Sequence, residues 1–272
     1  MTRQVALITG ASAGIGKATA ERLLNEGLVV YVAARRVEKM QDLVAKGAIA
    51  LAMDVTKEEE MVAAIAKIEQ AHGGVDILVN NAGFGSYGAM EDTSIEDARY
   101  QFEVNIFGLA RLTQLVLPHM RQQRAGKIIN ISSVGGKIYT PLGTWYHATK
   151  HALEGWSDAL RLEVSSFGID VVIVEPGLIQ TEFGDVMIGP MMERSGQGAY
   201  SAIAQKMEKA TKDSYENNGG SHPDVIAKVI TKAVKARKPK TRYVAGKMAK
   251  PVLFMRKLLS DRAFDKMIMN YA

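Results

Sequence analysis

The stretch that decides the fold runs from residue 5 to residue 16 and reads VALITGASAGIG. Its first half, Val5–Thr9, is an unbroken apolar and β-branched run, which predicts a buried strand. The glycines at positions 10, 14 and 16 predict a tight turn that leads into a helix. Such a turn directs unpaired backbone N–H groups and the positive end of the helix dipole toward an anion. We therefore expect a phosphate-binding turn at the end of the first strand.

The three glycines have separate expected roles. Gly10 permits the tight turn, Gly14 lets the backbone approach a pyrophosphate, and Gly16 allows the helix to pack closely on the strand. Glycines also occur in ordinary turns, so the position of this run at the first strand–helix junction gives it its weight. The residues expected to surround the phosphates are Gly10, Ser12, Ala13, Gly14, Ile15 and Gly16.

Strand-like and helical patterns alternate along the rest of the chain. Strands are predicted at 5–9, 29–32, 49–53, 75–79, 128–131, 169–174 and 242–245, and helices at 14–26, 38–46, 57–71, 94–122, 145–167 and 223–236. Most strands are apolar on successive residues, which is typical of strands covered by helices on both faces. Strand–helix–strand alternation implies parallel pairing through right-handed crossovers. The predicted fold is α/β, with one doubly wound parallel sheet of about seven strands.

Composition excludes several classes of protein. The chain has 272 residues, 47% of them apolar and 23% charged, and it contains no cysteine, which excludes disulfides, Cys-ligated zinc and thiol nucleophiles. We expect a cytoplasmic protein, since neither a signal peptide nor a membrane-spanning run is evident. No cluster of His and carboxylate residues has metal-ligand spacing, so no metal is expected. The net charge of +5 combines +11 over residues 228–272 with −6 over the first 227, which argues against a nucleic-acid-binding face.

The spacing Thr9-Gly10-x-x-x-Gly14-x-Gly16 resembles the glycine motif of the short-chain dehydrogenase/reductase family. Further segments appear in the order and spacing of that family. They are Asn80-Asn81-Ala82-Gly83, Asn105, Ser133, Tyr146-x-x-x-Lys150 and Pro176-Gly177 through Thr181. The resemblance implies an NADP-preferring oxidoreductase similar to carbonyl reductases and hydroxysteroid dehydrogenases. It also implies a single Rossmann-fold catalytic domain, which we place at residues 1–246. A C-terminal amphipathic extension is expected at 247–272, where the shortest members of the family tend to have ended.

The end of the second strand indicates which nicotinamide cofactor binds. An NAD site usually has Asp or Glu here, accepting hydrogen bonds from the adenosine ribose. This chain has Ala34 in that position, followed by Arg35 and Arg36. Without the carboxylate, a 2′-phosphate is not repelled, and guanidinium groups pair well with phosphate. We expect NADP(H), although two adjacent arginines are also common at the start of a surface helix.

The resemblance assigns further residues to the cofactor. Asp54 and Val55 match an adenine-binding pair, and Asp54 is also suited to capping the next helix. The segment from Pro176 to Thr181 matches one that contacts the nicotinamide amide and the phosphates. Outside the glycine turn, the expected cofactor-binding residues are Arg35, Arg36, Asp54, Val55, Asn81, Ala82, Gly83, Tyr146, Lys150, Pro176, Gly177, Ile179 and Thr181.

Tyr146 and Lys150 are four residues apart in a predicted helix, so they share one face. A tyrosine titrates near 10, and lowering its pKa by about 3 units requires about 4 kcal/mol. A cation about 4 Å away supplies roughly that amount at an effective dielectric near 20. We therefore expect Lys150 to lower the pKa of Tyr146, which would donate a proton to a developing alkoxide. In the family the lysine also binds the nicotinamide ribose.

Two further residues complete the expected catalytic set. Ser133 ends a strand and matches the family serine that hydrogen-bonds the substrate oxygen. Asn105 lies between Val104 and Ile106 in a predicted helix, where an amide competes with backbone hydrogen bonds. The resemblance implies that Asn105 distorts the helix and holds a water leading to Lys150. His147 and His151 match no catalytic position and are expected at the surface or behind the site.

Residues 184–220 contain several glycines and methionines, and such a long excursion predicts a substrate lid or a flexible segment. Its methionines, with Phe183 and Tyr200, predict an apolar wall, as do the neighbouring Tyr139, Leu142 and Trp145. We therefore expect an uncharged, fairly hydrophobic carbonyl substrate. The candidates left open are steroids, retinoids, acyl groups and small ketones or aldehydes.

The tail beyond residue 247 mixes apolar and basic residues, as in a basic amphipathic helix. Such a helix binds anionic lipid, packs on its own body or on a second subunit, or docks an acidic acyl-carrier partner. We expect the packing role, in a homodimer or homotetramer of the kind common in the family. The predicted activity is NADPH-dependent carbonyl reduction, reversible as an alcohol dehydrogenase. The alternatives are a beta-ketoacyl-carrier-protein reductase of fatty-acid synthesis and a non-catalytic NADP(H)-sensing regulator.

Overall fold

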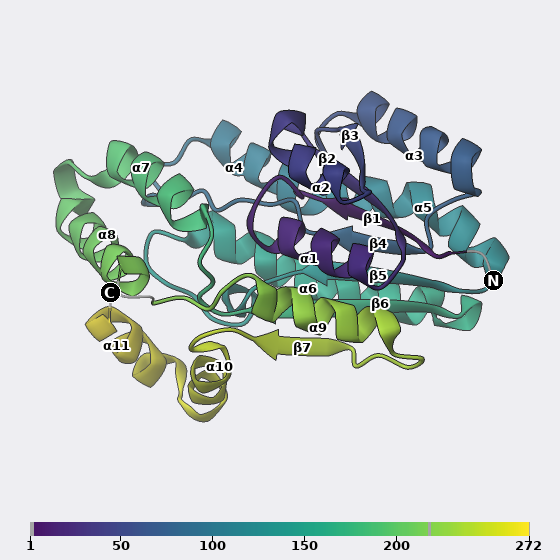
Figure 1. Cartoon of the computed structure of the whole chain (residues 1–272). Coiled ribbons are helices and arrows are strands. Elements are labelled where there is room, and N and C mark those ends of the chain that lie inside the picture. The colour runs from purple at the N-terminus through teal and green to yellow at the C-terminus, as the bar shows by residue number, and fades with distance from the viewer. Residues whose placement is uncertain (1–2, 217–218, 272) are drawn as a thin grey trace.

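The structure is a computed structural model that describes residues 3–216 and 219–271 (Figure 1). Its strands are β1 (Val5–Thr9), β2 (Val29–Ala34), β3 (Ile49–Ala52), β4 (Ile77–Asn80), β5 (Gly126–Ile131), β6 (Ile169–Pro176) and β7 (Arg242–Ala245). All pair in parallel, in the order β3-β2-β1-β4-β5-β6-β7. The predicted doubly wound sheet of about seven strands is therefore confirmed.

Helices separate most of these strands. They are α1 (Gly14–Asn25), α2 (Gln41–Ala45), α3 (Glu58–His72), α4 (Ile95–Phe102), α5 (Leu109–Gln123), α6 (Thr144–Val164), α7 (Phe183–Ser195), α8 (Ser201–Glu216), α9 (Asp224–Lys235), α10 (Ala249–Leu258) and α11 (Asp261–Tyr271). Local signals fix several boundaries. The hydroxyl oxygen of Ser94 accepts a hydrogen bond from the Asp97 amide and caps α4, and Gly73 ends α3 in the left-handed conformation.

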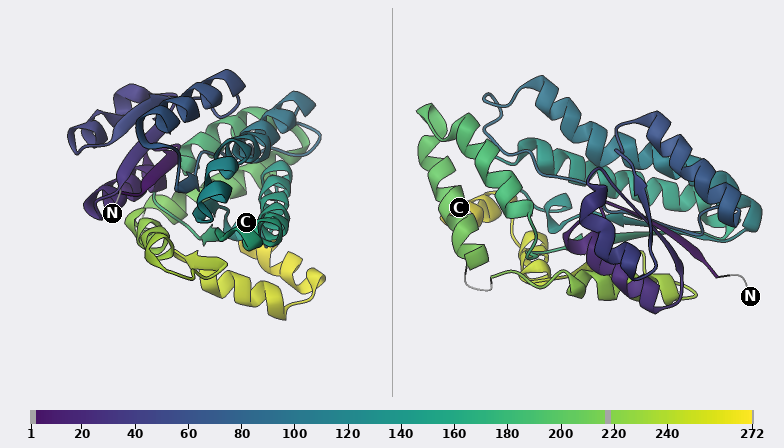
Figure 2. Two further views of the ribbon diagram at one scale, coloured as in Figure 1. Left: turned by 90° about the vertical axis from the view of Figure 1, so that its right-hand side faces the viewer. Right: turned by 45° about the horizontal axis from the view of Figure 1, so that its top comes forward.

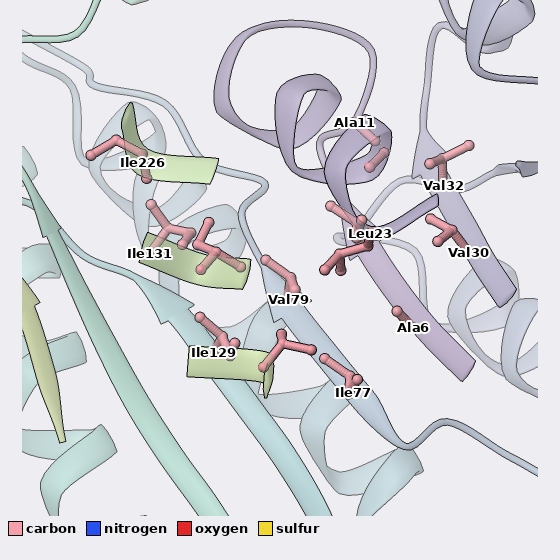
Figure 3. Packing of buried hydrophobic residues seen from close by; sticks show 14 of the residues in the cluster. Ala6, Ala11, Leu23, Val30, Val32, Ile77, Val79, Ile129, Ile131 and Ile226 are labelled. Atoms are coloured by element: carbon pink, nitrogen blue, oxygen red, sulfur yellow. The ribbon is translucent and has the colours of Figure 1, made fainter. Parts of the chain in front are cut away.

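Both faces of the sheet are covered by helices. Side chains of β1, β2, β4, β5 and β6 that point to one face pack against α1, α2 and α9, and Figure 3 shows Leu23 of α1 and Ile226 of α9 in that layer. Alternate residues of the same strands pack against α3, α5 and α6 on the other face. The views in Figure 2 show the sheet between these two layers. Because both faces are buried, the strands consist of continuous apolar runs.

The strand order reverses beside β1, which has β2 on one side and β4 on the other. In open α/β sheets, ligands bind outside the carboxyl ends of the strands at such a switch point. The turn after β1 and the segment after β4 both open onto this crevice. The topology therefore places the glycine turn and Asn81–Gly83 at one ligand-binding edge.

Several segments differ from the sequence predictions. The helix predicted over 94–122 is divided by a π-helical segment, Glu103–Gly108, between α4 and α5. The described part of residues 184–220 is not irregular, since α7 and α8 pack side by side as a hairpin at one end of the molecule (Figure 1). Pro190 lies inside α7.

The tail forms two helices instead of one, and α10 and α11 lie beyond β7 near the hairpin (Figure 1). Phe264 of α11 is fully buried and packs edge-to-face on Tyr139, with ring centroids 5.4 Å apart. The division at residue 246 stays a prediction, and Ala272 lies outside the described residues. None of the helices within 3–216 and 219–271 has the length and apolar character needed to cross a membrane.

Candidate active site

A cavity of about 920 Å³ lies at the carboxyl edge of the sheet. Nearly all of the residues predicted for the cofactor and the reaction line it. They are Gly10, Ser12, Ala13, Gly14, Ile15, Arg35, Arg36, Asp54, Val55, Asn81, Ala82, Gly83, Ser133, Tyr146, Lys150, Pro176, Gly177, Ile179 and Thr181. Gly16 and Asn105 lie behind these lining residues. Residues spread over 172 positions of the sequence thus meet at one site.

The glycine turn has the geometry of an anion-binding helix end. Gly10 has φ +64°, a conformation that glycine adopts without strain, and a Cβ at Gly16 would lie 2.5 Å from the carbonyl oxygen of Gly10. In the described chain no side chain caps α1 at Ala13, and the first turn of α1 contains no acidic residue. The N–H groups of this turn therefore face the cavity without a competing carboxylate.

Thr9 and Asn81 hold the two turns of the crevice together. The Thr9 hydroxyl accepts hydrogen bonds from the amides of Asn81 and Ala82, at 3.0 and 2.9 Å. The Asn81 side chain donates to the carbonyl oxygens of Thr9 and Gly10, at 2.9 and 3.1 Å. Asn81 thus shapes the backbone of the glycine turn through its side chain.

The two arginines after β2 lie at the mouth of the cavity. Arg36 Nη2 is 3.5 Å from the hydroxyl of Ser12 and 3.0 Å from a carboxylate oxygen of Glu182. Arg35 reaches toward the Tyr100 hydroxyl at 3.5 Å. Glu182, which immediately precedes α7, was not predicted. The one sequence signal for Glu182 is that it is a charged residue directly after Thr181, where the predicted cofactor-binding segment ends.

Asp54 does not cap the next helix as expected, since the N-cap of α3 is Lys57, whose side chain makes no capping hydrogen bond. The contact of Asp54 with adenine stays a prediction. Its Oδ1 accepts hydrogen bonds from the amide and the hydroxyl of Thr56, both at 2.9 Å, in the turn before α3. The same residue lines the cavity. Asp54 therefore orders the turn that forms this part of the wall.

Ser133 and Tyr146 form the centre of the site. Ser133 follows β5, Tyr146 lies in the first turn of α6, and their hydroxyl groups are hydrogen-bonded. Burial raises the pKa of Tyr146 to about 12, and the hydrogen bond to Ser133 partly offsets this rise. The prediction that Lys150 lowers the pKa of Tyr146 is wrong for this structure, because desolvation of the phenol dominates. The phenol therefore keeps its proton at neutral pH.

Lys150 lies one helical turn after Tyr146 and is almost fully buried. Its Nζ donates a hydrogen bond to the carbonyl oxygen of Ile131, at 2.9 Å. Burial lowers the pKa of Lys150 to about 8, while the nearby Glu154 acts in the opposite direction. An amine with this pKa exchanges protons readily near neutral pH.

Asn105 lies in the π-helical segment, and the predicted helix distortion is present. Its side-chain amide pairs with both backbone groups of Phe84, donating to the carbonyl at 3.0 Å and accepting from the amide at 3.2 Å. A Cβ at Gly83 would lie 3.1 Å from Asn105 Oδ1 and 3.9 Å from Lys150 Nζ. Asn105, behind the cavity lining, and Lys150, within it, therefore approach the same glycine.

His147 is a buried structural residue of the site. Its Nδ1 donates to the carbonyl oxygen of Gly135 at 2.9 Å, and its Nε2 accepts from the Thr140 amide at 3.0 Å. Burial lowers the pKa of His147, so the ring stays neutral near pH 7. It fixes the loop that carries Ser133.

Of the residues named for the apolar wall, Phe183 lines the cavity, and the rest of the wall is built by residues that were not predicted. Phe183 and Val186 of α7 and Tyr215 of α8 line it on one side. The tail helices contribute Pro251, Val252, Met255, Met267 and Ile268. Sequence reasoning missed the tail residues in this role, although their spacing in an amphipathic pattern was a usable signal.

The methionines of the hairpin lie behind that wall. Met187, Met191 and Met207 are buried in one cluster with Leu142 and the ring of Tyr146. Tyr139 packs against Phe264, as described above, and Trp145 stacks edge-to-face on Phe102. The expectation that Tyr139, Leu142 and Trp145 face the substrate is therefore wrong. These side chains support the wall from behind.

Comparisons with known proteins agree with this geometry. Residues 4–187 match the family described as short chain dehydrogenase, and the chain belongs to that family. It is 39% identical over 254 residues to a 3-ketodihydrosphingosine reductase of Bacteroides thetaiotaomicron, covering 93% of this chain and 91% of that protein. It is 35% identical over 274 residues to an NADPH-dependent 3-dehydrocapnine reductase of Ornithobacterium rhinotracheale, covering 96% and 94%.

Among solved structures, a short-chain dehydrogenase from Streptomyces avermitilis is similar over the whole length. The TM-score is 0.84 at 36% identity, covering 99% of this chain and 97% of that one. The family expected from the sequence is therefore confirmed, and the chain is an oxidoreductase of the short-chain type.

Proposed function

We propose that this protein is an NADP(H)-dependent oxidoreductase that reduces a ketone or aldehyde of a fairly hydrophobic substrate to an alcohol, reversibly. The observation that carries the proposal is the hydrogen-bonded pair of Ser133 and Tyr146, which shares one cavity with the α1 N-terminus. A proton donor and an anion-binding turn in one crevice are what carbonyl reduction by a nicotinamide dinucleotide requires.

The cofactor side of the cavity fits an NADP(H) molecule. The free end of α1 offers backbone N–H groups to a pyrophosphate, and Arg36 stands beside Ser12 with a guanidinium for a 2′-phosphate. A related reductase is named as NADPH-dependent, which supports the same choice here. When bound, NADPH supplies the hydride.

The protein residues supply the proton and bind the oxygen. Tyr146, kept protonated by burial, donates its proton to the carbonyl oxygen as the carbon accepts the hydride. The C=O bond becomes C–OH, and the tyrosine is left as a phenolate. Ser133 hydrogen-bonds the substrate oxygen and stabilises the developing charge.

Lys150 restores the phenol. With a pKa near 8 its ammonium is a ready proton source for the phenolate one helical turn away. Asn105 positions the backbone at Phe84, next to Gly83, through its two hydrogen bonds. Lys150 Nζ also approaches Gly83. The water expected at Asn105 and the binding of the nicotinamide ribose by Lys150 are part of this proposal.

The wall of the cavity supports a hydrophobic substrate. Phe183 and Val186 of α7 and Met255 of α10 present carbon surface to the cavity. Two relatives are named for the reduction of lipid ketones, 3-ketodihydrosphingosine and 3-dehydrocapnine. A carbonyl on a long apolar chain is therefore the first class to test. The α7–α8 hairpin acts as the lid over this part of the site, and a cytoplasmic homo-oligomer stays the expected setting.

The test is turnover of ketones, aldehydes and acyl thioesters with NADPH and NADH, measured by loss of nicotinamide absorbance. We expect NADPH-dependent reduction of apolar ketones or aldehydes. Tyr146→Phe should lower kcat at least 100-fold, in line with loss of general acid catalysis, with NADPH affinity retained. The matched control is Tyr87→Phe, since Tyr87 is buried in the same cavity with its ring centroid 5.6 Å from that of Tyr146. We expect this control to keep kcat within about tenfold, because the phenol that is hydrogen-bonded to Ser133 is that of Tyr146 and Tyr87 has no part in the proposed proton transfer.

Other outcomes favour the alternatives. Preferential turnover of an acyl-carrier thioester would identify a beta-ketoacyl-carrier-protein reductase. Tight NADPH binding with no turnover of any carbonyl would identify a nucleotide-sensing regulator. Unchanged activity of Tyr146→Phe would refute the assignment of the acid.

A further inference from the structure

The two tail helices have an inner and an outer face. On the inner face Phe264 is fully buried, while Met255 and Met267 line the cavity. These residues account for the packing role that the sequence suggested. They leave the outer face of α10 and α11 unexplained.

The outer face carries large apolar side chains in contact with solvent. Phe254 and Leu258 of α10 are 64% and 67% exposed, and Met269 of α11 is 48% exposed. Phe254 and Leu258 are one helical turn apart, so their side chains are neighbours on the surface. Adjacent exposed apolar residues of this size are typical of an interaction site.

Basic residues surround these apolar side chains. Lys250 lies one turn before Phe254 on the same stripe of α10, and Lys257 lies beside Leu258. On α11, Arg262 and Lys266 continue toward Met269 with the same helical spacing. All four basic residues are exposed.

The acidic residues of the tail are already engaged. Asp261 forms an ion pair with Arg256 at 2.8 Å, and Asp265 accepts a hydrogen bond from the Tyr139 hydroxyl at 2.9 Å. Four exposed basic residues outnumber these two carboxylates, so the outer face keeps an excess of positive charge. This charge belongs to the +11 of residues 228–272, on a body with a charge of −6.

We propose that the outer face of α10 and α11 docks on an anionic phospholipid bilayer. Phe254, Leu258 and Met269 enter the boundary between headgroups and acyl chains, and the surrounding lysines and arginine contact lipid phosphates. A second copy of the chain is a poorer occupant, because two equally basic faces repel each other.

This docking places the cavity next to the membrane. The inner faces of the same helices line the cavity, so α10 and α11 form a thin partition between the bilayer and the reacting groups. A long-chain carbonyl would pass from the lipid phase to Tyr146 without crossing bulk water. Docking itself does not depend on the reaction, so it is tested independently of the proposed function.

The experiment is flotation of the full chain with phosphatidylcholine vesicles, with and without phosphatidylglycerol. We expect binding to the anionic vesicles, weakened by salt, and little binding to the neutral ones. The double variant Phe254→Ser/Leu258→Ser should reduce the partition coefficient at least tenfold, because two interfacial side chains are lost. Lys250→Glu and Lys257→Glu should each reduce it at least fivefold, given about 1 kcal/mol for a basic residue near the surface.

The matched control is Val62→Ser/Lys67→Glu on α3, where an apolar and a basic residue are also exposed. This control should bind vesicles like the unaltered chain. Neither Phe254 nor Leu258 lines the cavity. In Phe254→Ser/Leu258→Ser, turnover of a water-soluble carbonyl and the circular dichroism spectrum should therefore be unchanged. Light scattering on a sizing column gives the oligomeric state of each protein.

Three results would overturn the proposal. The first is the absence of binding to anionic vesicles, and the second is equal loss of binding in the α3 control. The third is an oligomer that dissociates when Phe254 and Leu258 are replaced, since this face would then be a subunit interface. None of these results depends on whether the protein reduces a carbonyl.

Discussion

Arg36 and Glu182 form an ion pair across the mouth of the cavity, with Nη2 and Oε2 3.0 Å apart. Lys39 approaches the same carboxylate at 3.4 Å. Hydrogen bonding to Arg36 lowers the pKa of Glu182, so the carboxylate is ionised at neutral pH. The pair therefore places a negative charge beside the guanidinium that we assign to the 2′-phosphate of NADP(H).

Neutralising Glu182 should strengthen NADPH binding. In Glu182→Gln the guanidinium no longer has a competing carboxylate, and an exposed ion pair contributes at most about 1 kcal/mol. We expect the KM for NADPH to fall about two- to fivefold, with the KM for NADH unchanged. Glu163→Gln, at an exposed glutamate of α6, is the control. A higher KM for NADPH in Glu182→Gln would show that the carboxylate helps to bind the dinucleotide.

Arg36→Ala should have the opposite effect. Loss of a charge-assisted hydrogen bond costs about 1.5–3 kcal/mol, which corresponds to a KM for NADPH raised about 10- to 100-fold. The KM for NADH should change less than about twofold, because that cofactor lacks the phosphate. Arg35→Ala, measured in parallel, distinguishes the contribution of Arg35 to NADPH binding from that of Arg36. Equal changes for both cofactors would refute the role of the arginines as a phosphate site.

The pH dependence of kcat tests the role of Lys150. Its pKa of about 8 means that the ammonium is present below that pH and lost above it. If Lys150 returns the proton to Tyr146, kcat for reduction should fall about tenfold per pH unit above pH 8. The charge of Glu154 raises the pKa of Lys150, so Glu154→Gln should move this fall to lower pH.

Glu154 also forms ion pairs with Lys137 and Arg242, at 3.0 and 3.1 Å, and is 3% exposed. The Glu154→Gln profile must therefore be measured below the unfolding temperature of the variant, which we expect to be lowered. An unchanged pH profile in a folded Glu154→Gln protein would contradict proton supply by Lys150.

Gly16→Ala and Gly155→Ala should shift stability in opposite directions. A Cβ at Gly16 would lie 2.5 Å from the carbonyl oxygen of Gly10 and 2.6 Å from Asn81 Nδ2, so overpacking should cost about 1–3 kcal/mol. Gly155 lies mid-helix in α6 with nothing within 4 Å of its ideal Cβ, so alanine should add about 0.5–1 kcal/mol. Urea unfolding measures both changes. Equal stability of the two variants would contradict the close packing at Gly16.

Much of the sheet could be predicted because its strands are buried on both faces. Val5–Thr9 and Arg242–Ala245 were located to the residue. The site residues could be grouped because the carboxyl ends of parallel strands meet at one edge of a sheet. Ser133, after β5, and Asn81, after β4, lie at that edge for this reason.

Other features depend on tertiary packing and leave little local signal. Gly184, Gly189 and Pro190 suggested irregular structure, yet α7 is helical because Met187 and Met191 are buried against neighbouring side chains. The pKa of Tyr146 also depends on burial, which the spacing to Lys150 does not show. The contact of Glu182 with Arg36 links positions 146 apart, and no local pattern encodes it.

The long sequence separation of Arg36 and Glu182 contrasts with the short one between Ser133 and Tyr146. Ser133 and Tyr146 are thirteen positions apart, on a turn and a helix that follow one another, whereas Arg36 and Glu182 belong to distant parts of the chain. Breaking one exposed ion pair takes at most about 1 kcal/mol, far less than dismantling a buried turn. We therefore expect that a small outward movement of Glu182, which breaks its ion pair with Arg36, is enough for the oxidised dinucleotide to leave. Ser133 and Tyr146 would stay in place for the next turnover.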